Sequence, residues 1–172
     1  MPDVTIRLAD NDSDIDSAKA LCLNWLDWHW QHYADDWPRG ADHPMHPDAF
    51  RAVVANLPVL HARPRGGILL ASVDGQDVGC VMFHDAGSNR AEFKRIFVSD
   101  GGRGHGVGTK LLEALFTQLR ADGNDSVFLS SATFLTHARH MYQAAGFTDM
   151  PLPAGFLAAW RDRVYFMQKS LR

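Results

Sequence analysis

The clearest chemical signal in the sequence lies in the glycine-rich segment Arg103 to Gly108, RGHGVG. Glycines at alternate positions remove the Cβ atoms that would block close approach, and they permit positive φ angles. Successive backbone N–H groups can therefore converge on one oxygen-rich group. The helical pattern that follows adds unpaired N–H groups and a positive dipole end, and Arg103 adds a charge that matches phosphate oxygens. The segment is predicted to bind a diphosphate.

Two common phosphate-binding motifs do not fit this segment. The dinucleotide motif G-x-G-x-x-G needs its third glycine one residue later, and no acidic residue ends a following strand to hold a ribose. The nucleotide P-loop needs Gly-Lys-Ser/Thr, whereas Lys110 follows Thr109 and precedes Leu111. The residue identities therefore separate this turn from both motifs.

The turn and two flanking segments resemble one protein family. RGHGVG follows a strand pattern and is similar to the R-G-x-G-x-G signature of the GNAT superfamily of N-acetyltransferases. Other positions resemble the family's fourth strand and its A-x-x-L-Y-x-x-x-G-F segment: Glu92, Lys94, Arg95 and Val98 in the first, and Ala138, Met141, Tyr142, Gly146 and Phe147 in the second. The close similarity covers about a third of the chain, and the order of elements extends it over most of the rest.

The resemblance implies a fold and a cosubstrate. The implied fold is the GNAT fold, an α/β protein of the α+β type, with a mixed twisted sheet of six to seven strands flanked by about four helices. Its fourth and fifth strands splay apart, and the pantetheine arm of acetyl-CoA lies in the gap. No metal is implied. The implied acetyl-CoA-binding residues are Ile96, Phe97, Val98, Arg103, Gly104, His105, Gly106, Val107, Gly108 and Thr109.

The implied reaction is direct attack of a neutral amine on the thioester, with the oxyanion held by the N–H of Val98. An amine is mostly protonated at neutral pH, so a base is needed. Glu92 occupies the position of the family's glutamate base, on the alternating face predicted to hold Lys94 and Ile96. Alternatively, Glu92 is half of an ion pair with Lys94. His84, at the end of the preceding strand, and water are the competing bases.

Tyr142 stands where the family commonly has the tyrosine that gives the departing thiolate a proton or a hydrogen bond. The alternative is an aromatic core residue. Many family members carry an asparagine seven residues earlier, whereas this chain has Leu135, so the cofactor contact there stays open. His105, Lys110 and Arg139 either assist with phosphates or are ordinary surface residues.

The composition fits one domain over residues 1–172. With 46% hydrophobic residues, a chain of 172 residues can bury one full core but not two. A net charge of −3 argues against nucleic acid or an anionic membrane as the main partner. No leader pattern or membrane-spanning apolar run is seen, so a cytoplasmic location is expected. Cys22 and Cys80 lack metal-ligand spacing and are expected to be buried free thiols.

Periodicity and turn residues predict the order of the secondary-structure elements. The predicted elements are a strand over 4–8, a helix to about 33, a loop over 34–47, a helix capped by Asp48, a hairpin over 67–84, a strand over 91–98, a helix ending at Gly123, a parallel strand over 126–131, a helix over 136–144, and strands over 147–150 and 164–171.

The first helix has apolar residues beyond its core stripe, among them Leu23, Leu26 and Trp30. A second helix, a homodimer partner or the wall of a substrate pocket would cover them. The substrate pocket is predicted from residues 25–47 and 151–163, the least patterned segments. The histidines in the first of these segments lack metal-ligand spacing and are expected to be solvated or to contact substrate. They are His29, His32, His43 and His46.

Three functions are compatible with these patterns. The leading hypothesis is transfer of the acetyl group of acetyl-CoA to an amine of a small molecule. The close rival acetylates the N-terminus or a lysine of a protein or peptide. The third, from another class, is a non-catalytic acyl-CoA-binding sensor, against which the candidate catalytic pair Glu92 and Tyr142 argues.

Overall fold

Two tight turns set the register of the central strands. In the computed structural model, which describes residues 1–172, β2 (Gly66–Val73) and β3 (Gln76–Asp85) are joined through Asp74 and Gly75, with φ angles of 48° and 83°. Positive φ at both residues gives the turn a twist that matches the flanking strands, as the Asp-Gly pair predicts. β4 (Arg90–Val98) follows through a second turn and pairs antiparallel with β3.

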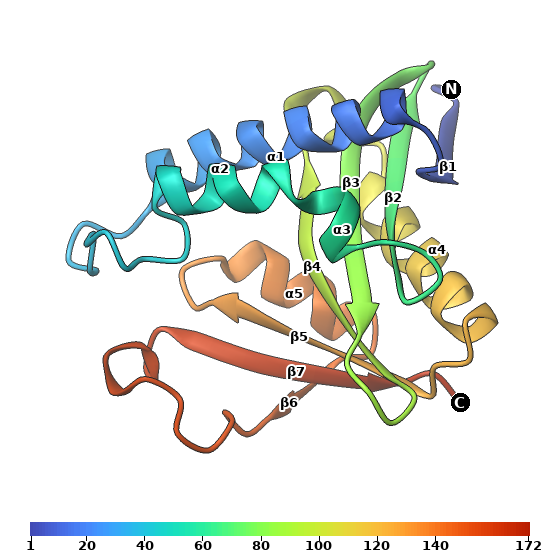
Figure 1. Ribbon diagram of the computed structural model, residues 1–172. Helices are drawn as coiled ribbons and strands as arrows, with labels where there is room; N and C mark the ends of the chain where they lie inside the picture. Colours follow the sequence, from blue (N-terminus) through green and yellow to red (C-terminus); the bar gives the residue numbers. More distant parts are fainter.

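Seven strands form one mixed sheet in the order β1-β2-β3-β4-β5-β7-β6 (Figure 1). The remaining strands are β1 (Val4–Leu8), β5 (Ser126–Ala132), β6 (Thr148–Met150) and β7 (Val164–Ser170). β4 and β5 are the parallel pair, and all other neighbours are antiparallel. The predicted mixed sheet is confirmed.

β4 and β5 separate soon after they meet. The last pair of their short ladder joins Glu92 to Phe128. Beyond it β5 stays paired with β7 and β4 with β3, so the edge of β4 from Phe93 to Val98 has no strand beside it. Figure 1 shows the two strands diverging. The predicted splayed pair is present, and its fork begins at Glu92.

Helices cover both faces of the sheet (Figure 1). One face carries α1 (Asp12–His32), α2 (Pro47–Ala55) and α3 (Leu57–Leu60), and the other carries α4 (Val107–Ala121) and α5 (Thr136–Ala144). Short 3-10 turns lie at Asp100–Gly102 and Ala158–Trp160. The short helix α3 is the one helix beyond the four expected. None of the helices combines the length and the apolar character that crossing a membrane requires.

Two details of the α1–α2 region differ from the prediction. Leu26 was expected off the core stripe but is buried, because α2 packs across α1 and brings Phe50 into the same cluster. A second helix therefore covers Leu26, whereas Leu23 remains 39% exposed. Asp48 does not cap α2. The cap is His46, whose Nδ1 accepts a hydrogen bond from the Asp48 N–H at 3.4 Å, because Pro47 takes the first helical position.

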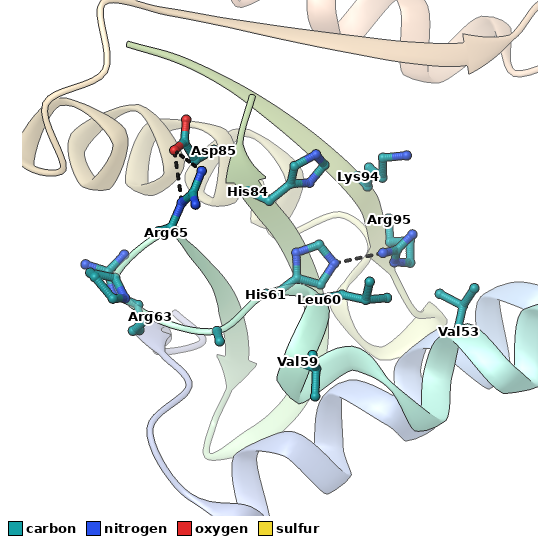
Figure 2. Close-up of a pocket in the computed structure, with 12 residues that line it drawn as sticks. Val53, Val59, Leu60, His61, Arg63, Arg65, His84, Asp85, Lys94 and Arg95 are labelled. Carbon is teal, nitrogen blue, oxygen red and sulfur yellow. Dashed lines mark hydrogen bonds and ion pairs between the residues drawn. The ribbon is translucent and has the colours of Figure 1, made fainter. Parts of the chain in front are cut away.

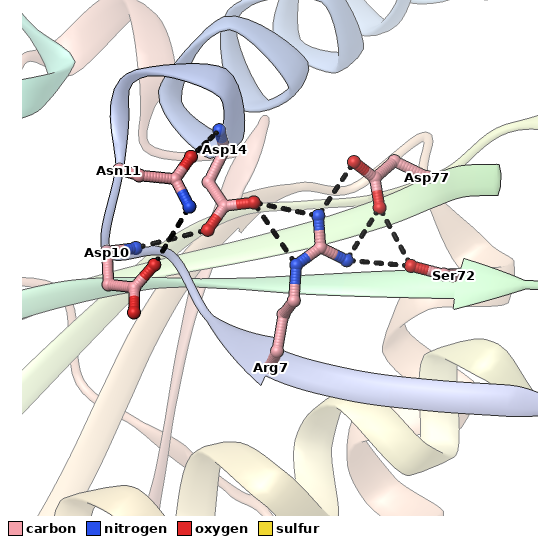
Figure 3. Close-up of polar contacts among 6 residues, drawn as sticks. All are labelled: Arg7, Asp10, Asn11, Asp14, Ser72 and Asp77. Carbon is pink, nitrogen blue, oxygen red and sulfur yellow. Dashed lines mark hydrogen bonds and ion pairs between the residues drawn. The ribbon is translucent and has the colours of Figure 1, made fainter. Parts of the chain in front are cut away.

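A charged cluster ties the start of α1 to the β2–β3 hairpin (Figure 3). The Arg7 guanidinium donates to Asp14 Oδ1 at 2.9 Å and to both carboxylate oxygens of Asp77 at 2.7 and 2.9 Å. Ser72 accepts from Arg7 and donates to Asp77. The hydrogen bond from Arg7 lowers the pKa of Asp77 to about 2, and a similar bond lowers the pKa of Asp14. Arg7 therefore holds two carboxylates in their charged form.

Arg7→Met is expected to lower the free energy of unfolding by about 2 to 4 kcal/mol at pH 7, because it leaves two mostly buried carboxylates without a cation. The folded-state pKa of Asp77 lies below its unfolded value, so this stabilisation is present above about pH 4 and is lost as the pH falls toward 2. Urea unfolding at pH 7 and pH 3 measures both effects. A difference between variant and wild type that did not shrink at pH 3 would contradict this account.

Candidate active site

The turn between β4 and α4 leaves its backbone open to solvent. Gly104 and Gly106 have φ angles of 79° and 70°, and Gly106 is the N-cap residue of α4. A Cβ added at either glycine would meet no atom within 4 Å. The next residue, Val107, is buried and anchors the turn in the core. Glycine is therefore favoured at both positions because it allows a positive φ angle and leaves the turn accessible to a ligand, and internal packing does not require it.

The backbone N–H groups of this turn are available to a ligand. From Gly104 to Thr109, none donates to another backbone carbonyl, whereas the Lys110 N–H donates to Gly106. Adjacent free donors at a helix N-terminus favour an anion. Arg103 lies beside them and pairs with Asp100 at 3.1 Å. The Asp100 side chain is 92% exposed, so this ion pair is weak and a phosphate group can replace the carboxylate.

Glu92 lies at the fork, on the face covered by α1, α2 and α3. Its Oε2 is 3.2 Å from His84 Nε2, and its Oε1 is 3.5 Å from Lys94 Nζ. Burial raises the pKa of Glu92, but the hydrogen bond with His84 and the charge of Lys94 outweigh burial, so the pKa lies below its usual value. The structure thus joins the two candidate bases in one pair, and the ion pair with Lys94 is present as well.

A β-bulge reverses the alternation of β4 beyond Lys94. Between the pairs Met82–Lys94 and Cys80–Phe97, β4 has two residues where β3 has one, so β4 carries one extra residue. Arg95, in this bulge, has a φ angle of 55°. Phe97 consequently packs on the α1 face, and Ile96 packs on the α4 face. The prediction that Glu92, Lys94 and Ile96 share one face is therefore wrong for Ile96.

Tyr142 approaches the fork from the opposite face. Its ring meets Phe93 edge-on, with 5.6 Å between ring centroids, and it is 4% exposed, so it also packs in the core. Burial raises the pKa of Tyr142, and the neighbouring Tyr165 raises it further, so the hydroxyl stays protonated and can donate. Phe93 is the first residue past the last β4–β5 pair. Glu92 and Tyr142 therefore flank the start of the fork from two sides of β4.

The other residues considered for cofactor contact fall into two groups. His105 and Lys110 are exposed beside the open turn. Arg139 is engaged elsewhere, because it pairs with Asp149 at 3.0 Å. Leu135 is the N-cap residue of α5 and supplies no side-chain acceptor there, whereas an asparagine could cap the helix.

The two long loops meet at an aromatic cluster. Trp37, from the loop after α1, lies 5.3 Å from Phe134 and 6.5 Å from Trp160, measured between ring centroids. Trp160 also lies 5.1 Å from His43. Segments 34–46, 133–135 and 151–163 are therefore packed against one another.

Two histidines of this region are hidden in the cluster. His43 is buried, its Nδ1 accepts from the Met45 N–H, and its Nε2 therefore donates to the Tyr33 hydroxyl. His29 is buried with no hydrogen-bond partner on either ring nitrogen, and burial lowers its pKa to about 4. Both side chains were expected to be solvated or to contact substrate. Aromatic packing instead holds them neutral in the interior. No group of three or more potential metal ligands is found in the chain.

A cavity of about 580 Å³ lies on the α3 side of β3 and β4 (Figure 2). His84 and Lys94, the two partners of Glu92, form part of its wall, together with Arg95 and residues 59–65. This volume is in the range of small-molecule sites. The cavity lies outside the segments from which the sequence predicted the substrate pocket. No local pattern marked residues 59–65, because their role depends on where α3 packs.

Comparison with known proteins decides the family. The sequence profile of the acetyltransferase (GNAT) family matches residues 23–147. This chain belongs to the GNAT family. A relative from Azospirillum brasilense, named IAA acetyltransferase, is 28% identical over 150 residues, which are 87% of each chain.

Solved structures agree with the GNAT fold. A GNAT-family acetyltransferase from Staphylococcus aureus superposes with a TM-score of 0.74 at 20% identity, over 99% of this chain and 100% of the other. An aminoglycoside 6'-acetyltransferase type Ii superposes with a TM-score of 0.72 at 16% identity, over 98% and 97% of the two chains. At identities this low, the similarity shows a shared fold and does not identify the acceptor substrate.

Proposed function

We propose that this GNAT acetyltransferase transfers the acetyl group of acetyl-CoA to the amine of a small molecule, by direct attack in a ternary complex. The observation that carries the proposal is the cavity of about 580 Å³ next to the His84–Glu92 pair at the fork of the sheet. Its volume suits a small ligand better than an extended peptide. Bound acetyl-CoA supplies the activated acetyl thioester.

Acetyl-CoA binding is assigned to the open turn and the free edge of β4. The N–H groups from Gly104 to Thr109 have no backbone partner and would receive the diphosphate. Arg103 would exchange its exposed carboxylate partner for a phosphate oxygen. Ile96, Phe97 and Val98 lie where β4 has no strand on its β5 side, so those backbone groups of this edge that point away from β3 can pair with the amides of the pantetheine arm.

Proton transfer from the acceptor is assigned to Glu92. Its lowered pKa keeps it ionised at neutral pH, and its contacts with His84 and Lys94 fix the carboxylate in place. It takes the proton of the attacking amine directly or through one water. The N–H of Val98 is the proposed donor to the developing oxyanion.

Tyr142→Phe is expected to lower turnover about 100-fold while leaving acetyl-CoA affinity and melting temperature nearly unchanged. The substitution removes one oxygen and keeps the ring that packs on Phe93. Without the hydroxyl, the thiolate that departs from the fork loses its proton donor. Pre-steady-state measurement of CoA release shows whether this step limits the rate. Full activity under rate-limiting chemistry would leave water as the acid.

Mass spectrometry of products from a panel of small amines and peptides tests the function. The purified chain is incubated with acetyl-CoA and each acceptor, and acetylated products and free CoA are measured. Acetylation of small amines without acetylation of peptides is expected. Products confined to peptide N-termini or lysines would contradict the proposal in favour of the protein-modifying alternative. Tight acetyl-CoA binding without product from any acceptor would favour the non-catalytic module.

A further inference from the structure

We propose that the cavity beside β4 binds a carboxylate group through Arg95, so that the acceptor is an amine that also carries a carboxylate, such as an amino acid. The identity of this ligand as the acceptor rests on the proposed acetyl transfer. The carboxylate site itself rests only on the geometry of the cavity (Figure 2).

Most hydrogen-bond donors of the Arg95 guanidinium have no partner in the chain. Arginine carries five N–H donors, and the structure gives this side chain one hydrogen bond, from Nη2 to His61 Nε2 at 2.7 Å. The Nε of Arg95 is buried and has no partner. His61 cannot neutralise the charge, because its Nδ1 lies 2.9 Å from the Phe83 carbonyl and must carry the proton, which leaves Nε2 as a neutral acceptor. A half-buried guanidinium with a buried, unpartnered Nε favours an anionic partner.

Arg95 is the one cation of the cavity wall without a carboxylate partner. Arg65 pairs with Asp85 at 3.0 Å, and Lys94 pairs with Glu92 at 3.5 Å. The remaining cation of the wall, Arg63, also binds an aspartate, Asp122. Since a single positive charge is left uncompensated, the cavity favours a monoanion such as a carboxylate over a doubly charged phosphate.

The positions of the cavity residues also suit a carboxylated amine. Lys94 and His84, which line the same cavity as Arg95, both contact Glu92. A ligand whose carboxylate meets Arg95 can therefore present its amine toward the base at the fork. Val53, Val59 and Leu60 supply apolar wall for the rest of the ligand. The bulge at Arg95, with its φ angle of 55°, turns this side chain to the α3 side.

Side-chain NMR with hexanoate as the probe tests the carboxylate site without catalysis. In the chain labelled with ¹⁵N-arginine, the Nε–H resonance of Arg95 is identified by its loss in Arg95→Lys, or by its contact with the His61 ring if that variant does not fold. Hexanoate is expected to shift this resonance, and hexanamide, which has the same shape without the charge, is not. No shift with hexanoate, or equal shifts with both, would overturn the proposal.

Steady-state kinetics test the link to the acceptor. Arg95→Gln is expected to raise KM for L-leucine about 10- to 100-fold relative to L-leucinamide, because only the amino acid carries the charge that Arg95 binds. Arg51→Gln makes the same change on the exposed part of α2, outside the cavity, and should leave the ratio unchanged. Equal losses for both acceptors, or preference for O-phosphoethanolamine, would overturn the carboxylate assignment. A hexanoate shift without any acetylation would keep the site and reject the proposed function.

Discussion

Gly106→Val is expected to abolish acetyl-CoA binding, with an affinity loss of more than about 100-fold, in a domain that stays folded. A Cβ added at this position meets no atom of the chain within 4 Å, so the valine side chain would extend into the open space beside the free N–H groups, where the diphosphate would lie. A β-branched residue also resists the φ angle of 70° at this position, which displaces the donors. Calorimetry of acetyl-CoA binding and circular dichroism measure the two effects.

Gly155→Val is the matched control for that variant. Gly155 has a φ angle of 78° and open space around its Cβ position, and it lies in the loop before β7, away from the turn. Both variants should lose similar stability through backbone strain, on the order of 1 to 3 kcal/mol. Only the Gly106 variant should lose acetyl-CoA affinity. Equal affinity losses in both variants would remove the turn from the cosubstrate site.

Glu92→Gln is expected to lower kcat by about 10²- to 10⁴-fold, the usual range for a general base, with little change in acetyl-CoA affinity. Glutamine keeps the shape of the side chain and can still hydrogen-bond to His84 and Lys94, but it carries no charge and cannot take a proton. The defect should shrink as the pH rises, because more of the acceptor amine is then neutral. The pH profile of kcat/KM for variant and wild type is the measurement.

Two further variants test whether the effect of Glu92→Gln comes from the loss of a general base. Glu113→Gln, the same change at an exposed position on α4, should leave the profile untouched. His84→Asn removes the imidazole that meets Glu92 and is expected to cost less than Glu92→Gln if the carboxylate is the base. A Glu92→Gln defect that did not vary with pH would indicate a structural role. A larger defect in His84→Asn would transfer the base role to the histidine.

Local signals in the sequence predicted most of the fold. The Asp74–Gly75 turn, the glycine turn at Arg103 to Gly108 and the helix end at Gly123 each depend on the conformations that a few neighbouring residues allow. Hydrophobic periodicity then fixed which faces are buried. Glu92 and Tyr142 could be singled out because they match positions of a known family pattern, and the structure places them on two sides of the fork.

Features that depend on long-range packing could not be predicted. The bulge at Arg95 changes the face of every later residue of β4, yet no glycine or proline marks it in the sequence. His61 meets Arg95 only because α3 packs against this strand. The burial of His29 and His43 requires aromatic side chains from three separate segments. Patterns in a single sequence describe spacing along the chain and do not determine such contacts between distant segments.

A crystal structure of the chain with bound CoA would show directly whether the open turn and the fork of the sheet form the acetyl-CoA site. We expect the diphosphate on the N–H groups from Gly104 to Thr109, the pantetheine arm along the free edge of β4, and the sulfur within hydrogen-bond reach of the Tyr142 hydroxyl. The cavity wall at His84 and Lys94 should then open toward the sulfur. A CoA molecule bound away from this turn, or with its sulfur far from Glu92 and Tyr142, would contradict this assignment of the active site.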